Sequence, residues 1–320
     1  MTPPRQLGLF DPALDVPPPD PALVALAARV PPHVRFGTSS WTFEGWRGIV
    51  YQRKYRNQQS FVQESLAEYA RHPLFRTVGI DRSYYAPVPA DELRRYAEQL
   101  PPGFVCVSKV WSEITTRVFP DHPRHGERAG RPNDAFLDPD LFMREVAGPV
   151  LEGLGAHAGP LVLEIPQTTG GVAPAVFARE VDAFLRAVPA GLPLAFELRD
   201  RRLLVPEYLD TIARHGATHV FNYWSRMPSI REQLQIDGTM AGPVVVVRLM
   251  LPPGERYADL RERYAPFDRI AAPQPEMRDD VARVVDLCAR RGQDVFVIVN
   301  NKAEGSSPLT IEALARRVAR

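Results

Sequence analysis

The stretch F-G-T-S-S-W-T-F-E-G-W, residues 36–46, opens the alternation that decides the fold. A short strand predicted at 34–39 runs into a turn that carries two indoles and a carboxylate. Gly45 and Gly48 let the backbone turn sharply without steric cost, while Trp41 and Trp46 offer flat amphipathic rings. Two interpretations stay open. The tryptophans cap the core, or they line a ligand site, where aromatic walls with few polar groups are common.

Outward from this stretch, short β-branched runs alternate with longer amphipathic segments. The runs near 161, 244 and 295 are almost wholly apolar, as in parallel strands covered on both faces. The predicted strands are 34–39, 75–81, 104–110, 161–165, 194–198, 218–222, 244–250 and 295–300. The predicted helices are 59–70, 90–99, 139–154, 173–187, 206–214, 278–291 and 308–318. This alternation predicts an α/β fold, a TIM-barrel-like (β/α)8 single domain over residues 32–320, with a doubly wound open sheet as the alternative. Ser307 before Pro308 predicts a serine cap on the last helix.

Residues 1–31 differ in composition from the rest, because prolines surround one short apolar stretch. We expect a flexible tail that is mostly extended or disordered. Its segment Q-L-G-L-F resembles the short Q-L-x-L-F peptide by which bacterial DNA-processing proteins dock onto the replication sliding clamp. In that interpretation the clamp is bound by Gln6, Leu7, Leu9 and Phe10. The alternative is that these apolar side chains pack on the protein's own surface, since short motifs often match by chance.

Composition narrows the classes of function. The formal net charge of +1 gives no overall reason to expect a nucleic-acid or membrane partner. Cys106 and Cys288 both lie in apolar patterns, which favours a reducing compartment over a disulfide framework. The chain lacks an apolar run of membrane-spanning length and a basic-then-apolar leader. We therefore expect a cytoplasmic protein.

Most predicted strands end in a charged or amide side chain: Asp81, Lys109, Glu164, Glu197 with Arg199, Asn222, Arg248, and Asn300 with Asn301. In a barrel the carboxyl ends of the strands converge on one mouth, where enzymes of this fold keep their chemistry. A charge at the end of a buried strand costs several kcal/mol unless it is paired or meets water or ligand. The residues therefore form a functional site, or an ion-pair network, such as Glu197 with Arg248, that closes the top of the barrel.

Several of these strands carry a family resemblance. The motifs are G-T-S-S-W at 37–41, T-V-G-I-D-R-S-Y-Y at 77–85, P-P-G-F-x-C-V-S-K-V at 101–110, A-F-E-L-R at 195–199 and V-N-N at 299–301. Together they resemble the YecE-like family, domain of unknown function 72, from about residue 34 to 318. The resemblance implies a TIM-barrel-like fold with a polar pocket at the strand ends, but no reaction. Gly79 stands where the family usually has glutamate, and Glu164 where glutamine is common.

Within the expected pocket, Glu197 is the predicted general acid or base, oriented by Arg199 or Arg248. Lys109 and Asp81 complete the catalytic candidates. Lys109 serves as a permanent charge for an anionic substrate or, alternatively, as a base or Schiff-base amine. The predicted substrate-binding residues are Trp41, Tyr85 beside Tyr84, Arg199, Arg248, Asn300, Asn301 and Ser306. The two arginines suit a carboxylate or phosphate, and loop 301–307 is either a phosphate site at a helix start or an ordinary capped turn.

Other site classes find little support. The histidines are scattered, with His122 and His125 the closest pair, so we predict no metal site. Phosphate-loop, dinucleotide and serine-esterase motifs are missing, so no cofactor is predicted. The long segment 112–138 is predicted to be a lid or a disordered insertion. Its basic residues Arg124, His125, Arg128 and Arg131 either guide an anion or form a solvated surface.

Three functions are consistent with these features. The leading one is an enzyme that uses acid–base chemistry on a small anionic substrate, phosphorylated or sugar-like, at the barrel mouth. The second is a DNA-processing enzyme tethered to the sliding clamp through residues 6–10, although phosphate contacts normally leave a basic footprint. The third is a non-catalytic module that binds a metabolite. Fold analogy alone cannot choose among them.

Overall fold

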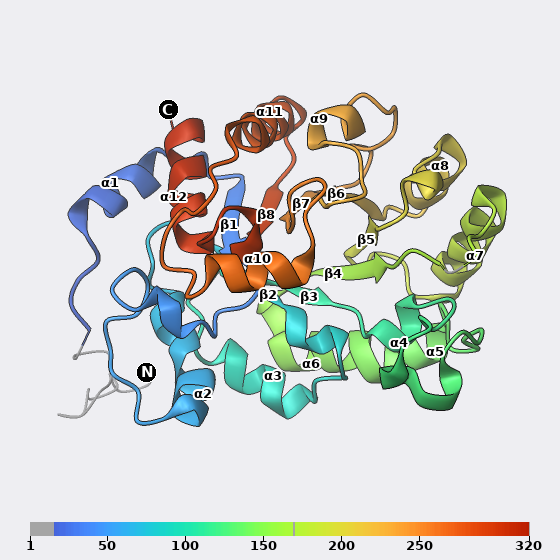
Figure 1. Cartoon of the computed structure of the whole chain (residues 1–320), viewed down its shortest axis with the longest axis horizontal. Helices are drawn as coiled ribbons and strands as arrows, with labels where there is room; N and C mark the ends of the chain where they lie inside the picture. Colours follow the sequence, from blue (N-terminus) through green and yellow to red (C-terminus); the bar gives the residue numbers. More distant parts are fainter. Residues whose placement is uncertain (1–15, 169, 320) are drawn as a thin grey trace, which may run out of the picture.

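A parallel sheet of eight strands organises the computed structural model, which describes residues 16–168 and 170–319. Its strands are β1 (Val34–Thr38), β2 (Thr77–Ile80), β3 (Val105–Lys109), β4 (Ala158–Ile165), β5 (Leu194–Leu198), β6 (Thr218–Tyr223), β7 (Val245–Leu249) and β8 (Val295–Val299). Their order is β1-β8-β7-β6-β5-β4-β3-β2, which follows the chain around a circle (Figure 1). A parallel bridge between Phe36 and Phe75 joins the two ends of the sheet. The barrel is therefore nearly closed, and the prediction of a (β/α)8 fold is confirmed.

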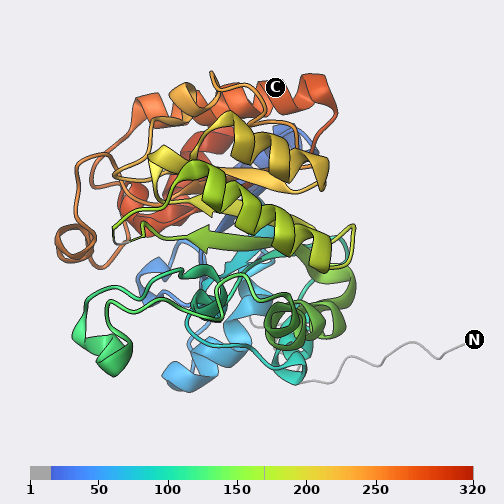
Figure 2. The same ribbon diagram turned by 90° about the vertical axis from the view of Figure 1, so that its right-hand side faces the viewer.

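Helices connect the strands and lie around them (Figure 2). They are α1 (Pro21–Arg29), α2 (Gln58–Tyr69), α3 (Ala90–Ala97), α4 (Ser112–Thr115), α5 (Pro139–Phe142), α6 (Gly148–Leu154), α7 (Pro174–Ala187), α8 (Pro206–Arg214), α9 (Ile230–Gln233), α10 (Tyr257–Tyr264), α11 (Pro275–Arg291) and α12 (Ser307–Val318). A π-helical turn, Met143–Ala147, joins α5 to α6, so the helix predicted at 139–154 is one segment with an irregular middle. In the described parts of the chain, no helix combines the length and apolar character needed to cross a membrane.

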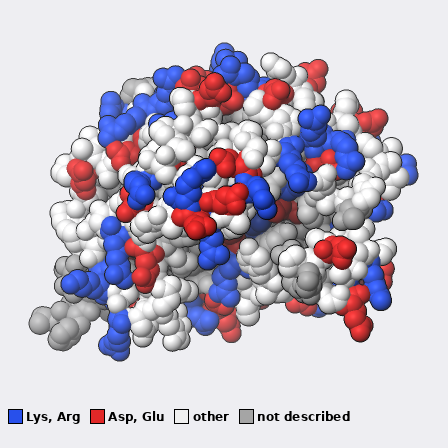
Figure 3. All heavy atoms as spheres, in the orientation of Figure 1, with Lys and Arg blue, Asp and Glu red and all other residues white. Residues whose placement is uncertain are grey.

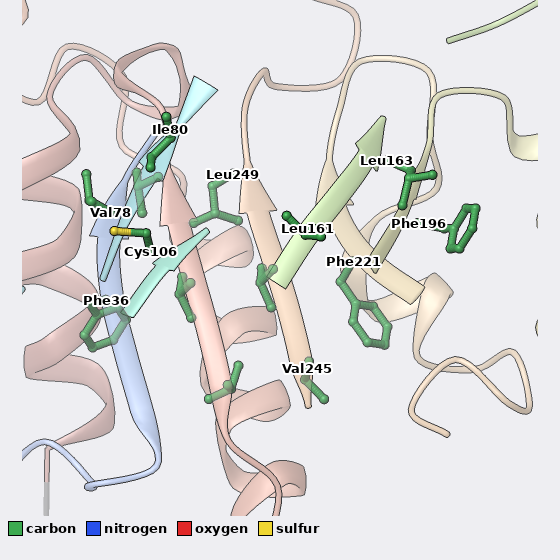
Figure 4. Packing of buried hydrophobic residues seen from close by; sticks show 14 of the residues in the cluster. Phe36, Val78, Ile80, Cys106, Leu161, Leu163, Phe196, Phe221, Val245 and Leu249 are labelled. Carbon is green, nitrogen blue, oxygen red and sulfur yellow. The ribbon is translucent and has the colours of Figure 1, made fainter. Parts of the chain in front are cut away.

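The strands bury side chains on both faces because successive residues point in opposite directions. The outward-facing set packs against the helices and includes Leu163, Phe196 and Phe221 (Figure 4). The inward-facing set fills the barrel with one phenylalanine and otherwise smaller or β-branched groups: Val107, Val162, Ala195, Val220, Val246, Phe296 and Ile298. The interior is thus a packed core, as in other (β/α)8 barrels, and leaves the mouth as the place for chemistry.

Two glycines allow β1 and β2 to approach each other. A Cβ on Gly37 would lie 2.1 Å from the carbonyl oxygen of Thr77. A Cβ on Gly79 would lie 2.9 Å from the carbonyl oxygen of Ser39. The amide of Arg76 donates to the carbonyl of Phe36 at 2.9 Å across the same junction. Any side chain at either glycine would push the two strands apart and open the barrel.

The N-terminal segment departs from the prediction. Residues 21–29, expected to be extended, form α1, which packs against α12. Asp20 accepts a hydrogen bond from the Ala22 amide at 2.8 Å, and Pro21 supplies the fixed φ of a first helical turn. Leu26 and Ala27 are buried, so the apolar stretch forms a helix because it has a surface on which to pack. The clamp-like peptide, residues 6–10, lies outside the described residues.

The start of α12 also differs from the prediction. Ser307 is the first helical residue rather than the cap, a position that Ser306 occupies. The Ser307 hydroxyl donates instead to Oδ1 of Asn301 at 2.9 Å, and its amide donates to the same oxygen at 2.8 Å. Asn301 therefore takes the capping role that we expected of the serine.

Candidate active site at the barrel mouth

Charged side chains form a layer directly above the apolar interior of the barrel. Each follows an interior residue by two positions along its strand: Lys109 after Val107, Glu164 after Val162, Glu197 after Ala195 and Arg248 after Val246. The period of two therefore points all four inward. Strand register places Glu164 beside Glu197, with Arg199 one residue beyond the end of β5. The charged side chains at the strand ends, predicted to converge, lie close together in the structure.

Glu164 lies at the centre of this layer. Its Oε2 accepts hydrogen bonds from Lys109 Nζ at 2.7 Å and from Arg199 Nη2 at 2.8 Å. Arg248 Nη1 lies 3.3 Å from the same oxygen. Glu164 was recognised from the sequence as a strand-end charge but was not among the predicted site residues. Its importance depends on three cations from three strands meeting at one oxygen.

Arg248 links the remaining carboxylates. Its Nη1 forms an ion pair with Glu197, and its Nη2 donates to both oxygens of Asp81 at 3.1 and 3.0 Å. Arg199 Nη2 lies 2.6 Å from Oε1 of Glu197. We call these four residues, together with Glu164 and Lys109, the mouth network. The Glu197–Arg248 pair proposed from the sequence as a closure of the barrel is present within it.

The electrostatics of the network keep Glu164 and Arg248 ionised. Burial on its own raises the pKa of Glu164, but the charges of Arg199, Lys109 and Arg248 outweigh it and hold that pKa well below its usual value. Burial lowers the pKa of Arg248, whereas the carboxylates of Asp81, Glu197 and Glu164 raise it to a net value above normal. Three cations thus face three carboxylates in a site of low dielectric, where such pairs interact strongly.

Exposure divides the network into an inner and an outer part. The side chains of Glu197 and Arg248 are 0% and 1% exposed, so they are covered by their partners. Glu164 and Asp81 are 15% and 23% exposed and reach the surface of the mouth. Both Nη atoms of Arg248 contact carboxylates, and Arg248 does not border the cavity described below. Glu197 is likewise in the inner part, away from the cavity.

A cavity of about 660 Å³ lies over the outer part of the network. It is lined by Glu164, Pro166, Gln167, Arg199, Trp224, Ser225, Arg226, Leu251, Gly254, Glu255, Arg256 and Tyr257. Arg199 is 6% exposed, and its Nε and Nη1 have no hydrogen-bond partner among the described residues. Because buried donors are nearly always satisfied, these two N–H groups favour a ligand or water within reach of the guanidinium.

Three cations at the mouth each lie over the face of an aromatic ring. Lys109 Nζ lies 3.9 Å from the ring centre of Tyr84, and the Arg199 guanidinium lies 3.9 Å from that of Trp224. Lys302 Nζ lies 3.9 Å from the ring centre of Tyr257. Such contacts fix both partners, since the ring faces attract the positive charge. Sequence reasoning missed Trp224 and Tyr257, because neither belongs to a recognisable motif.

Other predicted site residues occupy different surroundings. Trp41 is 3% exposed and packs edge-on against Tyr96, with ring centres 5.0 Å apart, so it lies in the core and does not line the cavity. Tyr85 is 75% exposed and contacts Tyr84. Asn300 accepts from the amide of Lys302 at 3.1 Å and from its Nζ at 3.3 Å.

The predicted phosphate loop, 301–307, is buried along its length. Asn301 and Ser306 are 2% and 0% exposed, and Trp46 Nε1 donates to Oδ1 of Asn301 at 3.2 Å. Asn301 thus ties the aromatic turn to the start of α12. Glu304 closes the loop from the other side, with Oε1 accepting from the Gln274 amide. Of the two interpretations, the capped turn describes this loop.

Segment 112–138 is anchored to the barrel in the parts described. Arg117 pairs with Glu180 of α7 at 3.0 Å, and Arg128 pairs with Glu113. The Arg128 guanidinium also lies 3.8 Å from the ring centre of Phe119. In the described ranges, no three His, Cys, Asp or Glu side chains come together as ligands for a metal ion.

Sequence comparison places this geometry in a family. The sequence model of DUF72, described as a protein of unknown function, matches residues 35–320. The chain belongs to the DUF72 family. The resemblance drawn from the strand motifs is thereby confirmed. No curated protein matches the chain.

Solved structures of DUF72 proteins share the fold. A DUF72 family protein from Enterococcus faecalis has a TM-score of 0.59 and 18% identity, covering 88% of this chain and 95% of its own. A second structure of that protein gives 0.55 and 14%, with coverage of 89% and 96%. A DUF72 family protein from Thermotoga maritima gives 0.57 and 17%, with coverage of 89% and 98%. At these identities the likeness establishes the barrel and no function.

The departure at Gly79 from the expected DUF72 pattern has a structural reason. Gly79 lies against Ser39 at the β1–β2 junction, where even a methyl group would be crowded. A carboxylate there would need a different approach of the two strands. Asp81, which begins the next helical turn, instead supplies the acid of this part of the mouth through its contact with Arg248.

Proposed function

We propose that this DUF72 protein is an enzyme that acts on a small anionic molecule by acid–base chemistry at the carboxyl-terminal mouth of its barrel. The observation that carries the proposal is the cavity over the mouth network, into whose lining Arg199 brings two unpartnered donors. Its volume falls within the range of small-molecule sites. A purely structural ion-pair network does not require an open cavity beside its central carboxylate.

The cavity favours negative charge. Arg226 and Arg256 line it, and neither lies within ion-pair distance of a carboxylate in the described part of the chain. Glu255, also in the lining, is paired with Arg263 at 2.7 Å. Glu164 is already shared among three cations. A carboxylate or phosphate entering the cavity would therefore meet excess positive charge, and Arg199 has two N–H donors without a partner among the described residues.

Lys109 and Glu164 are the acid–base pair in this proposal, with Lys109 Nζ donating to Glu164 Oε2 at 2.7 Å. The three cations make Glu164 a weak base, because they hold its pKa down. An anionic substrate on Arg199 adds negative charge and competes for that guanidinium, which raises the proton affinity of Glu164. Substrate binding would thus bring the carboxyl toward the working range of a general acid or base. Glu197 and Asp81 act here by positioning Arg199 and Arg248.

The test is a thermal-shift screen of the wild type, Lys109→Ala and Lys54→Ala with phosphorylated sugars, organic acids, nucleotides and short DNA. A ligand at 100 times its Kd should stabilise the protein by about 2.7 kcal/mol. We expect shifts from one anionic class, reduced in Lys109→Ala and kept in Lys54→Ala, whose lysine is exposed. Absence of a shift from every small anion would refute the proposal.

Turnover distinguishes an enzyme from a binding module. Once a ligand class is known, Glu164→Gln should abolish its conversion while reducing its affinity much less. Retained conversion in Glu164→Gln would remove the acid–base role. A DNA-processing function predicts instead that duplex DNA gives the largest shift, lost at high salt. The mixed charges on the face that carries α10 show no single basic area to favour that outcome (Figure 3).

A further inference from the structure

We infer that the ligand of the mouth cavity is a flat anion, a conjugated or aromatic ring that bears a carboxylate or phosphate group. This inference rests on the proposed function and specifies its substrate class. It starts from two aromatic side chains in the cavity lining, Trp224 and Tyr257. Trp224 directly follows β6, and Tyr257 begins α10 after β7, so neighbouring loops bring both rings to one cavity.

Each of these rings has a cation against one face. Arg199 covers a face of Trp224 and Lys302 covers a face of Tyr257, both at 3.9 Å from the ring centre. A cation–π contact draws on the negative potential of the ring face. Where the cavity borders the rest of the ring, that surface is then a poor partner for a second cation and a good one for a flat group that is neutral or electron-rich. Aromatic partners of this kind prefer offset or edge contacts.

Lys302 holds the ring of Tyr257 in place. The lysine is 5% exposed, and its Nζ contacts Asn300 Oδ1 and the rings of Tyr257 and Phe267. No carboxylate of the described residues lies within ion-pair distance of it. Burial of an unpaired ammonium is costly, and the ring face compensates part of that cost. Tyr257 itself is 51% exposed, so a large ring is held in place with much of its surface open.

Positively charged side chains lie beside Trp224 and Tyr257. Arg226 donates to Gln167 Oε1 at 2.8 Å, and Arg256 immediately precedes Tyr257. Both arginines line the cavity together with Arg199, whose Nε and Nη1 have no hydrogen-bond partner among the described residues. A ligand whose ring lies on Trp224 or Tyr257 would place an attached acidic group among these guanidinium groups. The aromatic rings favour a flat group and the arginines favour an acidic group. Together they select a flat anion.

The experiment compares matched anions by isothermal titration calorimetry on the full chain. One pair is benzoate with cyclohexanecarboxylate, and the other is a nucleoside monophosphate with ribose 5-phosphate. Within each pair the charge is kept while the flat ring is present or absent, and the two pairs separate carboxylate from phosphate ligands. We expect the planar member of at least one pair to bind about three- to tenfold more tightly, the range that an aromatic contact contributes.

Variants of Trp224 and Tyr257 show which ring causes the preference for the planar anion. Tyr257→Leu and Trp224→Leu should remove the preference for the planar member, while Tyr257→Phe and Trp224→Phe should keep it. Tyr257→Leu replaces an exposed side chain, so its folding should be preserved even if Trp224→Leu unfolds. Equal binding of both members of each pair, or a preference unchanged in the leucine variants, would overturn the inference and leave the proposed function intact. Failure of every anion to bind would overturn both.

Discussion

Glu197 of β5 and Arg248 of β7 form an ion pair across the interior of the barrel, over the intervening strand β6. The two side chains are 0% and 1% exposed, so the pair is shielded from water. Glu197 also contacts Arg199, and Arg248 also contacts Asp81 and Glu164. The pair therefore couples the barrel wall to the residues that border the cavity.

Glu197→Gln should lower the free energy of unfolding by about 3–5 kcal/mol, because it leaves Arg248 and Arg199 buried with less opposing charge. Urea unfolding followed by circular dichroism measures the change. Asp91→Asn is the matched control, since the Arg94–Asp91 pair at 2.6 Å has side chains that are 47% and 79% exposed. Exposed pairs contribute about 0–1 kcal/mol. A Glu197→Gln loss no larger than that of Asp91→Asn would show that the inner pair does not stabilise the barrel.

Gly37→Ala should destabilise the protein by about 1–3 kcal/mol or more, as overpacking of a core does. The added methyl would meet the Thr77 carbonyl oxygen at 2.1 Å, and backbone cannot move aside cheaply. Gly79→Ala should have a smaller effect, because its nearest contact is 2.9 Å from Ser39. Thermal unfolding of both variants shows which of the two substitutions destabilises the protein more. If Gly79→Ala proved the more damaging, steric closure of β1 on β2 would be the wrong explanation.

The strands could be predicted closely, because runs such as 194–198 and 295–300 are rich in apolar residues and have clear ends. Helix 21–29 could not, since the prolines around it suggest extended chain and its stability comes from packing against α12. The prediction that Ser307 caps the last helix was wrong for a related reason. The side chain that caps the turn, Asn301, lies six residues away from it and is fixed by tertiary contacts.

The candidate site could be predicted in part. Counting by two along β5 and β7 places Glu197 on one face with Ala195 and Arg248 on one face with Val246, and that step needs no tertiary information. The central position of Glu164 depends on three-dimensional convergence. Trp224 and Tyr257 lie in loops whose course no periodic pattern specifies. The burial of Trp41 and Asn301 likewise follows from the segments that cover them.

Stability should fall as the pH is lowered from about 6.5 to 4, in part because of His219. Burial lowers the pKa of this histidine to about 4, whereas the unfolded chain titrates near 6.5. The unfolded state therefore binds the proton first, so the stabilisation is complete above the unfolded pKa and is lost as the pH falls toward the folded one. The loss approaches about 3 kcal/mol for a shift of this size. Urea unfolding at a series of pH values measures it.

His219→Gln should flatten this pH dependence while keeping a polar group at the site. His72 gives an independent comparison, because burial also lowers its pKa to about 4. His72→Gln should remove a similar part of the slope, and the double variant should be flattest above pH 4.5. Below that, protonation of Glu164, whose pKa is held low, adds a further loss in every variant. An unchanged slope in His219→Gln would mean that this ring is already protonated in the folded state or takes its proton without unfolding.

A peptide of residues 1–15 should bind a bacterial sliding clamp through Gln6, Leu7, Leu9 and Phe10. Short peptides of this kind bind through a few apolar anchors, so replacing Leu9 and Phe10 with alanine should remove most of the affinity. Fluorescence anisotropy of the labelled peptide measures both. The full chain with and without the double alanine change is the necessary control, because the alternative, packing of these side chains on the protein's own surface, predicts that only the free peptide binds. No binding of the peptide at high micromolar concentration would exclude the clamp as a partner of this segment.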